Sequence, residues 1–336
     1  MPRLSIIIPV LGSAARLETT LISVLENRPP DCEILVVHNA PYADPYDLAG
    51  EIRFLPVASR VGIVECVNEG IQASHGSVVH LLASGLEVAE DWTEPALEHF
   101  QDPRVASVSP VVVDSLDTQV TVASGLAYSC RWGRIVRTDT PAATAITTTA
   151  SDTTHIEVLG PLVQAAFYRR SSLELVGGLP RAIGDGLADA DLALALRFAG
   201  YKGILEPRSI VLATADCLIA PRPGFRHGLA AERLFWRAAP VVGWGKSIAA
   251  HPLGVLVEFV TALPRPGALA VLLGRALGVC QMGSHRAHQQ WLLDVERAAA
   301  ALFRAERAGR LRIDGPHTPG QSILTKRTHA SARSAV

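Results

Sequence analysis

Two aspartates open a segment with helical periodicity in the second half of the chain. Asp189 and Asp191 precede an apolar run that ends at Phe198, and Gly200 supplies a stop signal. A carboxylate at a helix start can accept backbone N–H groups as a cap, or it can take a proton from a hydroxyl group as a general base. The sequence leaves both roles open for Asp189.

Polar residues also follow strand-like runs nearer the N-terminus. His38 and Asn39 end one such run, and Ser84 follows another. In open α/β sheets, ligands bind outside the carboxyl ends of the strands, so we expect these residues to line one cleft. The alternative for His38 is a polar residue that simply terminates a strand.

Arginines gather after the last predicted strand. Arg222 and Arg226 lie in the segment 221–227, and Arg233 follows shortly after. Planar guanidinium groups suit phosphate oxygens, so these side chains could neutralise a diphosphate. A solvated basic face, or contact with lipid headgroups beside the apolar helices that follow, is the alternative.

The elements that must position these residues alternate between two periodicities. Runs rich in Val, Ile and Leu predict strands, and apolar residues at helical spacing predict helices between them. This alternation is typical of an α/β fold with a mostly parallel sheet flanked by helices. The predicted strands are 4–9, 33–37, 52–56, 78–82, 105–113 and 210–213, and the predicted helices include 15–26, 63–73 and 189–198.

The chain divides into three predicted parts. Residues 1–227 form the α/β domain, 228–314 a Leu-, Ala- and Arg-rich helical region broken at Pro240, Pro252 and Pro264, and 315–336 a polar, flexible tail. Within the first part, the Thr/Ala-rich stretch 138–154 predicts a poorly ordered loop. The helical region could contact a membrane peripherally or mediate homo-oligomerisation.

Composition excludes several classes of function. The 336 residues carry 31 Lys and Arg against 32 Asp and Glu, so no global basic field favours nucleic acid. The five cysteines are scattered, and no export signal begins the chain, which favours a reduced, cytoplasmic setting. No uninterrupted apolar run reaches the roughly 18 residues that a membrane-spanning helix needs.

The ordered set of local signatures resembles the family 2 glycosyltransferases, which have a GT-A fold and move a sugar from a nucleotide-diphosphate donor. The resemblance covers roughly residues 3–240, and its pieces include the segments 5–10, 34–39, 62–76, 79–88, 169–178 and 189–201. It implies that Asp189 is the base, with Asp191 beside it. It also implies donor-binding candidates, namely Pro9, His38, Asn39, Arg60, Asn68 and Ser84, joined by Arg222 and Arg226 from the basic segment.

One departure from the family pattern concerns the metal. Members usually place two acidic residues after the fourth strand to bind Mn²⁺ or Mg²⁺, because hard cations prefer carboxylate oxygen. Here the sequence reads Ala83-Ser84-Gly85, and Glu87, two residues later, could reach the site only if the loop has an unusual conformation. Ala188 replaces the acid that precedes the base, and 213–215 lacks a histidine often found there. We therefore expect no metal ligands in this site.

The resemblance implies an inverting glycosyltransferase with a glycan or lipid-linked acceptor, active in polysaccharide or glycolipid synthesis at the inner membrane face. A catalytically impaired relative that serves as a nucleotide-binding or scaffold protein is the alternative, since a fold does not guarantee its chemistry. A dinucleotide-dependent oxidoreductase is disfavoured because 9–13, after the first strand, holds a single glycine.

Overall fold

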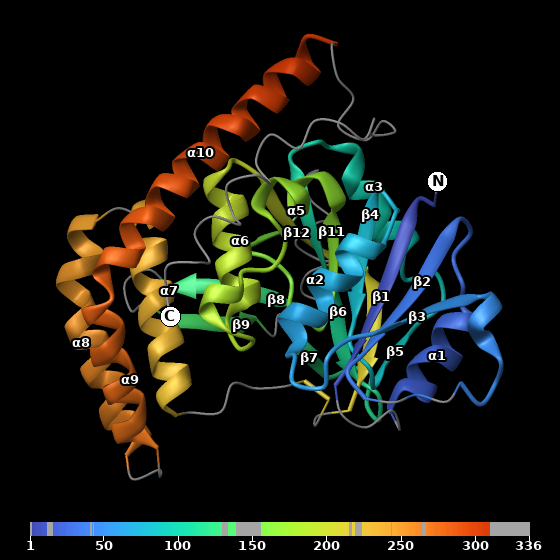
Figure 1. Ribbon diagram of the computed structural model, residues 1–336, viewed down its shortest axis with the longest axis horizontal. Helices are drawn as coiled ribbons and strands as arrows, with labels where there is room; N and C mark the ends of the chain where they lie inside the picture. The colour runs from blue at the N-terminus through green and yellow to red at the C-terminus, as the bar shows by residue number, and fades with distance from the viewer. Residues whose placement is uncertain are drawn as a thin grey trace.

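The computed structural model describes residues 2–11, 16–40, 42, 44–129, 134–138, 156–214, 217–218, 224–242, 244–263 and 267–309 (Figure 1). Apart from Thr138, the predicted loop 138–154 lies outside the described residues. Arg222 and the predicted tail 315–336 also lie outside them.

A mixed sheet of ten strands forms the centre of the molecule (Figure 1). β1, β2, β3, β4, β6 and β12 run in one direction, while β11 is antiparallel to both of its neighbours, β4 and β6. The predicted mostly parallel sheet is thus confirmed. The main order is β10 (Ile156–Val158), β12 (Lys202–Ala213), β6 (Val105–Asp114), β11 (Ala165–Arg169), β4 (Val78–Leu82), β1 (Leu4–Val10), β2 (Cys32–His38), β3 (Ile52–Pro56), with β5 (Leu86–Val88) on β12 and β7 (Thr121–Ala123) on β6. A separate hairpin joins β8 (Gly125–Ser129) to β9 (Arg134–Thr138).

Helices cover the sheet, as the apolar spacing predicts. α2 (Ile63–Ala73) packs on β1 and β2 and buries Val64, Val67 and Ile71, while α1 (Leu17–Glu26) packs beside β5. α5 (Arg170–Val176) contacts β11, and α6 (Ala188–Phe198) contacts β12. Near β12 lies α3 (Glu94–Glu98), and short 3-10 segments are η2 (Leu48–Gly50), η3 (His99–Gln101) and η4 (Arg181–Ile183).

The strands are buried because they carry apolar side chains on both faces. Every residue of β1, β4 and β11 is buried, and α6 is buried from Ala188 to Leu196. Removal of this apolar surface from water provides the main driving force for folding, at roughly 25 cal/mol per Å². The sheet therefore forms a rigid platform, and its edges carry the polar groups.

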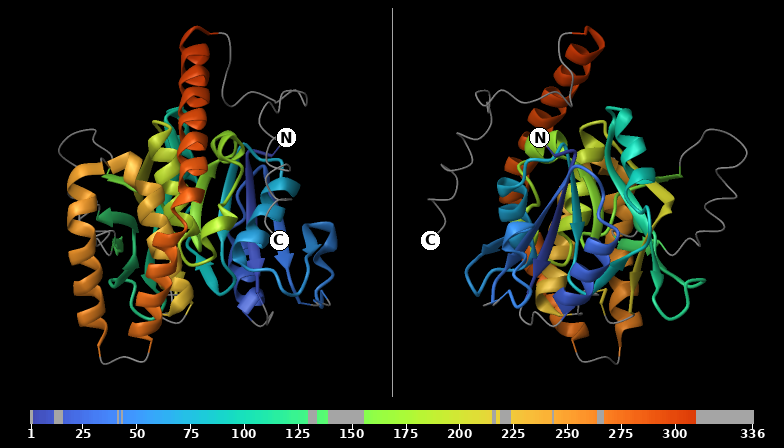
Figure 2. Two further views of the ribbon diagram at one scale, coloured as in Figure 1. Left: turned by 60° about the vertical axis from the view of Figure 1, so that its left-hand side comes forward. Right: turned by 90° about the vertical axis from the view of Figure 1, so that its right-hand side faces the viewer.

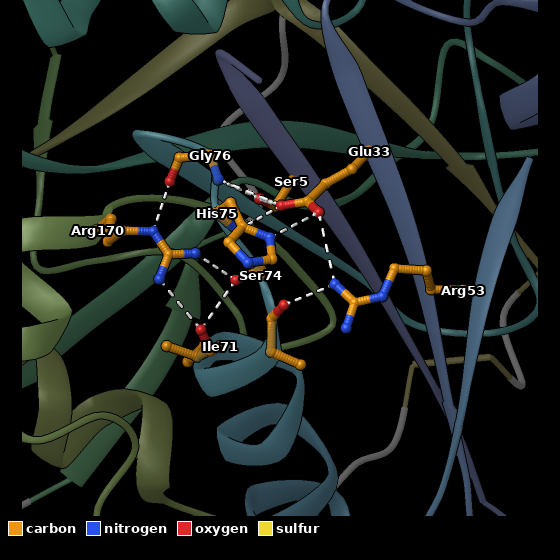
Figure 3. Close-up of polar contacts among 9 residues, drawn as sticks. Ser5, Glu33, Arg53, Ile71, Ser74, His75, Gly76 and Arg170 are labelled. Atoms are coloured by element: carbon orange, nitrogen blue, oxygen red, sulfur yellow. Dashed lines mark hydrogen bonds and ion pairs between the residues drawn. The ribbon is translucent and has the colours of Figure 1, made fainter. Parts of the chain in front are cut away.

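A polar cluster closes the amino-terminal edge of the sheet (Figure 3). The Glu33 carboxylate accepts hydrogen bonds from Ser5 Oγ at 2.6 Å, from Gly76 N–H at 3.2 Å and from the His75 backbone. Arg170 donates to the carbonyls of Gly76 at 2.6 Å and Ile71 at 3.1 Å, and to Ser74. Burial alone would raise the pKa of Glu33, but the hydrogen bonds from Ser5 and His75 outweigh it and lower that pKa.

Four helices follow the sheet, namely α7 (Phe225–Val242), α8 (Trp244–Ala262), α9 (Ala268–Cys280) and α10 (Met282–Arg307). The α7 and α10 side chains Leu234, Ala238, Val295 and Ala299 join the main core. α8 and α9 lie outside α7 and form the layer farthest from the sheet (Figures 1 and 2). The division at residue 227 stays a prediction.

The prolines of this region act in two ways. Pro252 lies inside α8, so the predicted break there is wrong, whereas Pro240 lies in the last turn of α7, which ends at Val242. A proline costs an internal helix hydrogen bond, and packing must offset that loss. α8 packs on α7 and α9, with the neighbouring residue His251 buried. No helix among the described residues is long and apolar enough to cross a membrane.

Candidate active site

Three strand ends meet at the carboxyl-terminal edge of the sheet, the lower edge in Figure 1. Val10 at the end of β1 is level with His38 at the end of β2, and Ile7 of β1 pairs with Leu81 of β4, so Ser84 follows β4 at the same level. His38 and Ser84 are both partly exposed. These residues therefore lie at one edge of the sheet, and the predicted cleft between them stays a prediction.

The end of β2 is held by local hydrogen bonds. His38 Nδ1 lies 2.7 Å from the Ala40 carbonyl oxygen, which can only accept, so this geometry places the proton on Nδ1. In the neutral ring, Nε2 is then an acceptor that suits a ligand hydroxyl or imide N–H. Asn39 donates its side-chain amide to the Val61 carbonyl at 3.2 Å, which ties β2 to the loop before α2.

The loop after β4 contains no carboxylate and packs tightly against α1. Gly85 has a φ of +97°, a conformation that favours glycine, and its N–H donates to Thr20 Oγ1 at 2.8 Å. A methyl group placed on Gly85 would lie 3.1 Å from Arg16 Cδ and 3.1 Å from Cys217 Sγ. The exposed side chain of Arg16 therefore runs beside the loop where the family resemblance would place metal-binding acids.

The residues that the structure describes at this edge do not fit a divalent cation. Ala83 and Ser84 offer no carboxylate oxygen, and Glu87 lies on β5, paired with Leu212. No group of three or more His, Cys, Asp or Glu side chains within the described ranges is arranged to hold a metal ion. Thr214, where a histidine often stands in the family, instead contacts Cys217 Sγ at 2.9 Å.

Asp189 lies in the first turn of α6, near the same edge. Its Oδ1 accepts the Ala190 N–H at 2.8 Å, and its Oδ2 accepts the Val163 N–H at 3.4 Å. The next residue, Gln164, accepts the Ala83 N–H on its carbonyl at 2.8 Å, so a short chain of contacts links Asp189 to the loop after β4. The side chain is 8% exposed. Backbone donors thus fix the carboxylate, as either a cap or a base requires.

Asp191 forms an ion pair within the chain, and its prediction as a catalytic residue stays untested. Arg237 of α7 donates Nε to Oδ1 at 2.8 Å and a second nitrogen to Oδ2 at 2.6 Å. Asp191 is 3% exposed. Both carboxylate oxygens of Asp191 thus bind the arginine in a bidentate pair and are not presented to a substrate. The pair fastens α7 to α6.

Asn68 likewise binds groups within the chain, and its prediction as a donor-binding residue stays untested. Its amide N–H donates to the Leu179 carbonyl at 2.9 Å, and its Oδ1 accepts the Leu179 N–H at 2.8 Å, so both ends of the buried side chain are used. The hypothesis that Arg233 binds a diphosphate meets the same difficulty, because Arg233 donates to Gln281 at 2.8 Å and to the Ala182 carbonyl at 3.0 Å.

The other predicted donor residues are spread more widely. Pro9 is buried within β1, and Arg60 is exposed in the turn before α2. Arg226 is exposed in the first turn of α7, which stands to one side of the strand ends in Figure 1. The backbone of Phe225, the residue before Arg226, packs closely against α9. A methyl group placed on Gly274 of α9 would lie only 2.1 Å from the Phe225 carbonyl oxygen.

Sequence reasoning missed Gln164, between Asp189 and the loop after β4. Its side chain is 5% exposed, yet its Oε1 finds no hydrogen-bond partner within the described part of the chain. A buried amide oxygen without a partner costs roughly 1–3 kcal/mol, which is tolerated where a ligand can supply the donor. An isolated Gln in an apolar run gave no signal of this in the sequence.

Comparison with known proteins supplies the context for this edge. Residues 5–175, more than half of the chain, match the family described as Glycosyl transferase family 2. No curated protein matched the sequence. Among solved structures, GalNAc-T7 with UDP, GalNAc and Mn²⁺ is similar at a TM-score of 0.56 and 14% identity. That similarity covers 87% of this chain, which spans only 56% of the length of the GalNAc-T7 chain.

A second similar structure is the mannosyltransferase PcManGT from Pyrobaculum calidifontis in complex with GDP-Man and Mn²⁺. It has a TM-score of 0.49 and 18% identity, over 89% of this chain and 86% of that one. At such identities a structural likeness concerns the fold alone, and the likeness to GalNAc-T7 confirms the predicted GT-A-like α/β class followed by a helical region. With the family match over residues 5–175, the chain belongs to glycosyltransferase family 2.

Proposed function

We propose that this protein transfers a sugar, with inversion, from a nucleotide-diphosphate donor to a hydroxyl group of a glycan or lipid-linked acceptor. The observation that carries the proposal is the Asp189 carboxylate, fixed by the N–H groups of Ala190 and Val163 at the carboxyl-terminal edge of a family 2 sheet. The reaction would serve polysaccharide or glycolipid synthesis at the inner membrane face.

In this mechanism Asp189 acts as general base. The carboxylate takes the proton of the acceptor hydroxyl while that oxygen attacks the anomeric carbon from the face opposite the diphosphate. The bond between the anomeric carbon and the diphosphate oxygen breaks, and the nucleoside diphosphate leaves with the electron pair. Base catalysis of this kind contributes about 10²–10⁴-fold to the rate.

A positively charged group must offset the charge of the leaving diphosphate. Because the loop after β4 has no carboxylate, we propose that transfer proceeds without a tightly bound divalent cation and that Arg16 assists instead. Its side chain runs beside Gly85 of that loop. Guanidinium groups bind phosphate oxygens through charge-assisted hydrogen bonds. A similar role for Arg222 or Arg226 stays a prediction, as do donor contacts from His38, Asn39, Arg60 and Ser84.

Calorimetry with a panel of UDP-, GDP-, ADP- and dTDP-sugars, in EDTA and in Mn²⁺, tests the donor proposal. We expect one donor to bind with the same Kd in both buffers. A donor that bound only with Mn²⁺ would contradict the cation-free mechanism but not sugar transfer. The anomeric configuration of the product, measured by NMR, tests inversion, and a retained configuration would exclude Asp189 as the base in this scheme.

A catalytically impaired nucleotide-binding or scaffold protein is the second candidate function. The missing acidic pair after β4 favours it, because most of the family relies on those carboxylates to hold the donor. Binding of a nucleotide sugar without turnover of any offered acceptor would support this candidate. If no nucleotide sugar bound, both sugar transfer and a nucleotide-binding function would be excluded, and a scaffold role would remain.

A further inference from the structure

The outward face of α8 and α9 is apolar over its whole described length. Each residue of the two helices that is exposed, where side chains are described, is Ala, Pro, Leu, Val or Cys. The larger ones are 38–66% exposed and fall at helical spacing on two adjacent stripes. With the following Leu263 they form what we term the α8–α9 face, made of Leu253, Leu256, Val257, Val260, Leu263, Leu269, Leu272, Leu273, Leu277 and Val279.

The charged side chains near this face point inward. Arg275 of α9 contacts Glu258 of α8 and donates to Glu232 of α7 at 3.0 Å. His251 of α8 lies 3.0 Å from both carboxylate oxygens of Glu232, and Trp236 Nε1 donates to the same group at 2.9 Å. Burial alone would raise the pKa of Glu232, but His251 and Arg275 lower it, so the carboxylate stays charged.

This arrangement is inverted relative to a helix pair that faces water. Helices on a protein surface place apolar side chains inward and charges outward, and contiguous exposed apolar surface of this extent marks an interaction site. Glycines let the polar interior pack closely, since methyl groups on Gly228 and Gly274 would collide with the backbone of the partner helix. An apolar exterior over a charged interior therefore favours contact with apolar surroundings.

The charge distribution along the chain indicates which surroundings these are. Residues 224–336 carry 15 Lys and Arg against 6 Asp and Glu, whereas residues 1–223 carry 16 against 26. Two exposed arginines lie on the helices next to α8 and α9, Arg226 in the first turn of α7 and Arg286 near the start of α10. Apolar helix faces bordered by basic side chains bind in the plane of anionic membranes.

We propose that the α8–α9 face docks this protein on an anionic lipid surface, with its leucines and valines in the acyl boundary and these two arginines at the headgroups. The helices lie on the bilayer, because no described helix can span one. A second copy of the chain fits less well. Protein interfaces concentrate Tyr, Trp, Arg and Met, and the exposed described positions of α8 and α9 contain none of them.

Co-sedimentation of the full chain with vesicles tests this proposal and does not depend on the proposed enzymatic function. One vesicle type contains phosphatidylcholine alone and the other adds phosphatidylglycerol. We expect strong binding to the anionic vesicles, weaker binding to the neutral ones, and a partial loss at high salt. The double variant Leu256→Glu with Leu273→Glu should bind anionic vesicles at least about 100-fold less, because each lost leucine contributes at least about tenfold.

The matched control is Ile22→Glu with Leu116→Glu, which adds the same two charges at exposed apolar positions outside the helical region. The affinity of this control for vesicles should fall about twofold at most, because its two added charges act on the membrane only at long range. Circular dichroism and Tm establish that both variants fold. The proposal would be overturned if the wild-type protein sedimented with neither vesicle type. So would a dimer in analytical ultracentrifugation that the α8–α9 variant abolished, since the face would then belong to a second copy.

Discussion

The two edges of the central sheet use polar side chains in opposite ways. At the amino-terminal edge, Glu33 and Arg170 each bind several partners from within the chain, and the cluster locks α2 and α5 to the strands (Figure 3). At the carboxyl-terminal edge, Gln164 buries an amide oxygen without a partner in the described chain. The first edge satisfies its charged groups within the chain, whereas the second leaves the Gln164 amide oxygen without a donor among the described residues.

The largest expected effect comes from Asp189→Asn. Asparagine keeps an oxygen for the N–H groups of Ala190 and Val163 but cannot take a proton, so activity with the donor identified by calorimetry should fall about 10²–10⁴-fold. Unfolding in urea should show little change. Full activity in this variant would mean that Asp189 only caps α6.

Asp191→Asn is the control for that experiment, because it lies two residues along the same helix. It removes one partner of the buried pair with Arg237. Such a loss destabilises a protein by about 3–5 kcal/mol. We therefore expect the urea midpoint to fall while the folded fraction keeps its catalytic rate.

Arg16→Gln has the next largest expected effect. Loss of the guanidinium group should lower kcat/KM about 30-fold, the equivalent of about 2 kcal/mol for a hydrogen bond to a charged group. The control is Arg3→Gln, whose exposed ion pair with Glu94 at 3.3 Å contributes little. Equal activity in the two variants would remove Arg16 from the site.

Glu33→Gln probes the opposite edge and should change stability by about 1–2 kcal/mol without altering the rate of folded protein. The pKa of Glu33 lies below its ordinary value of 4.5. The charged group therefore contributes stability above pH 4.5 that is lost as the pH falls through the lower, folded-state value. Urea unfolding of both proteins at several pH values should show the difference narrowing in acid. A difference that grew in acid would contradict this assignment.

Sequence reasoning located most of the sheet because its strands are continuous apolar runs with few alternative structures. β1, β2, β3, β4 and β6 fall within a residue of the predicted ranges or match them. β11 was missed, since Ala165–Arg169 has no clear β-branched run and becomes a strand only by pairing with β4 and β6. The hairpin of β8 and β9 was also missed, although Ile135, Val136 and Thr138 favour a strand.

The candidate site was less predictable because its side chains find partners far along the chain. Helix-start signals located Asp189, but the sequence could not show that Asp191 pairs with Arg237, 46 residues away. Asn68 binds the backbone of Leu179, 111 residues away. The family pattern gives the positions of these residues, and only tertiary packing decides which of them remains available to a substrate.

The smallest expected effect, and the sharpest test of the contrast between the edges, comes from Gln164→Met. Methionine has a similar length and no polar atom to bury, so removal of an unpartnered amide oxygen should leave stability unchanged or raise it by up to about 1 kcal/mol. If that oxygen binds a donor or acceptor hydroxyl, kcat/KM should fall about fivefold. A loss of stability instead, measured by urea unfolding, would show that Gln164 serves the fold as Glu33 does, and the two edges would then differ less than their contacts indicate. Stability gained together with activity lost is the outcome that only a ligand-binding role produces.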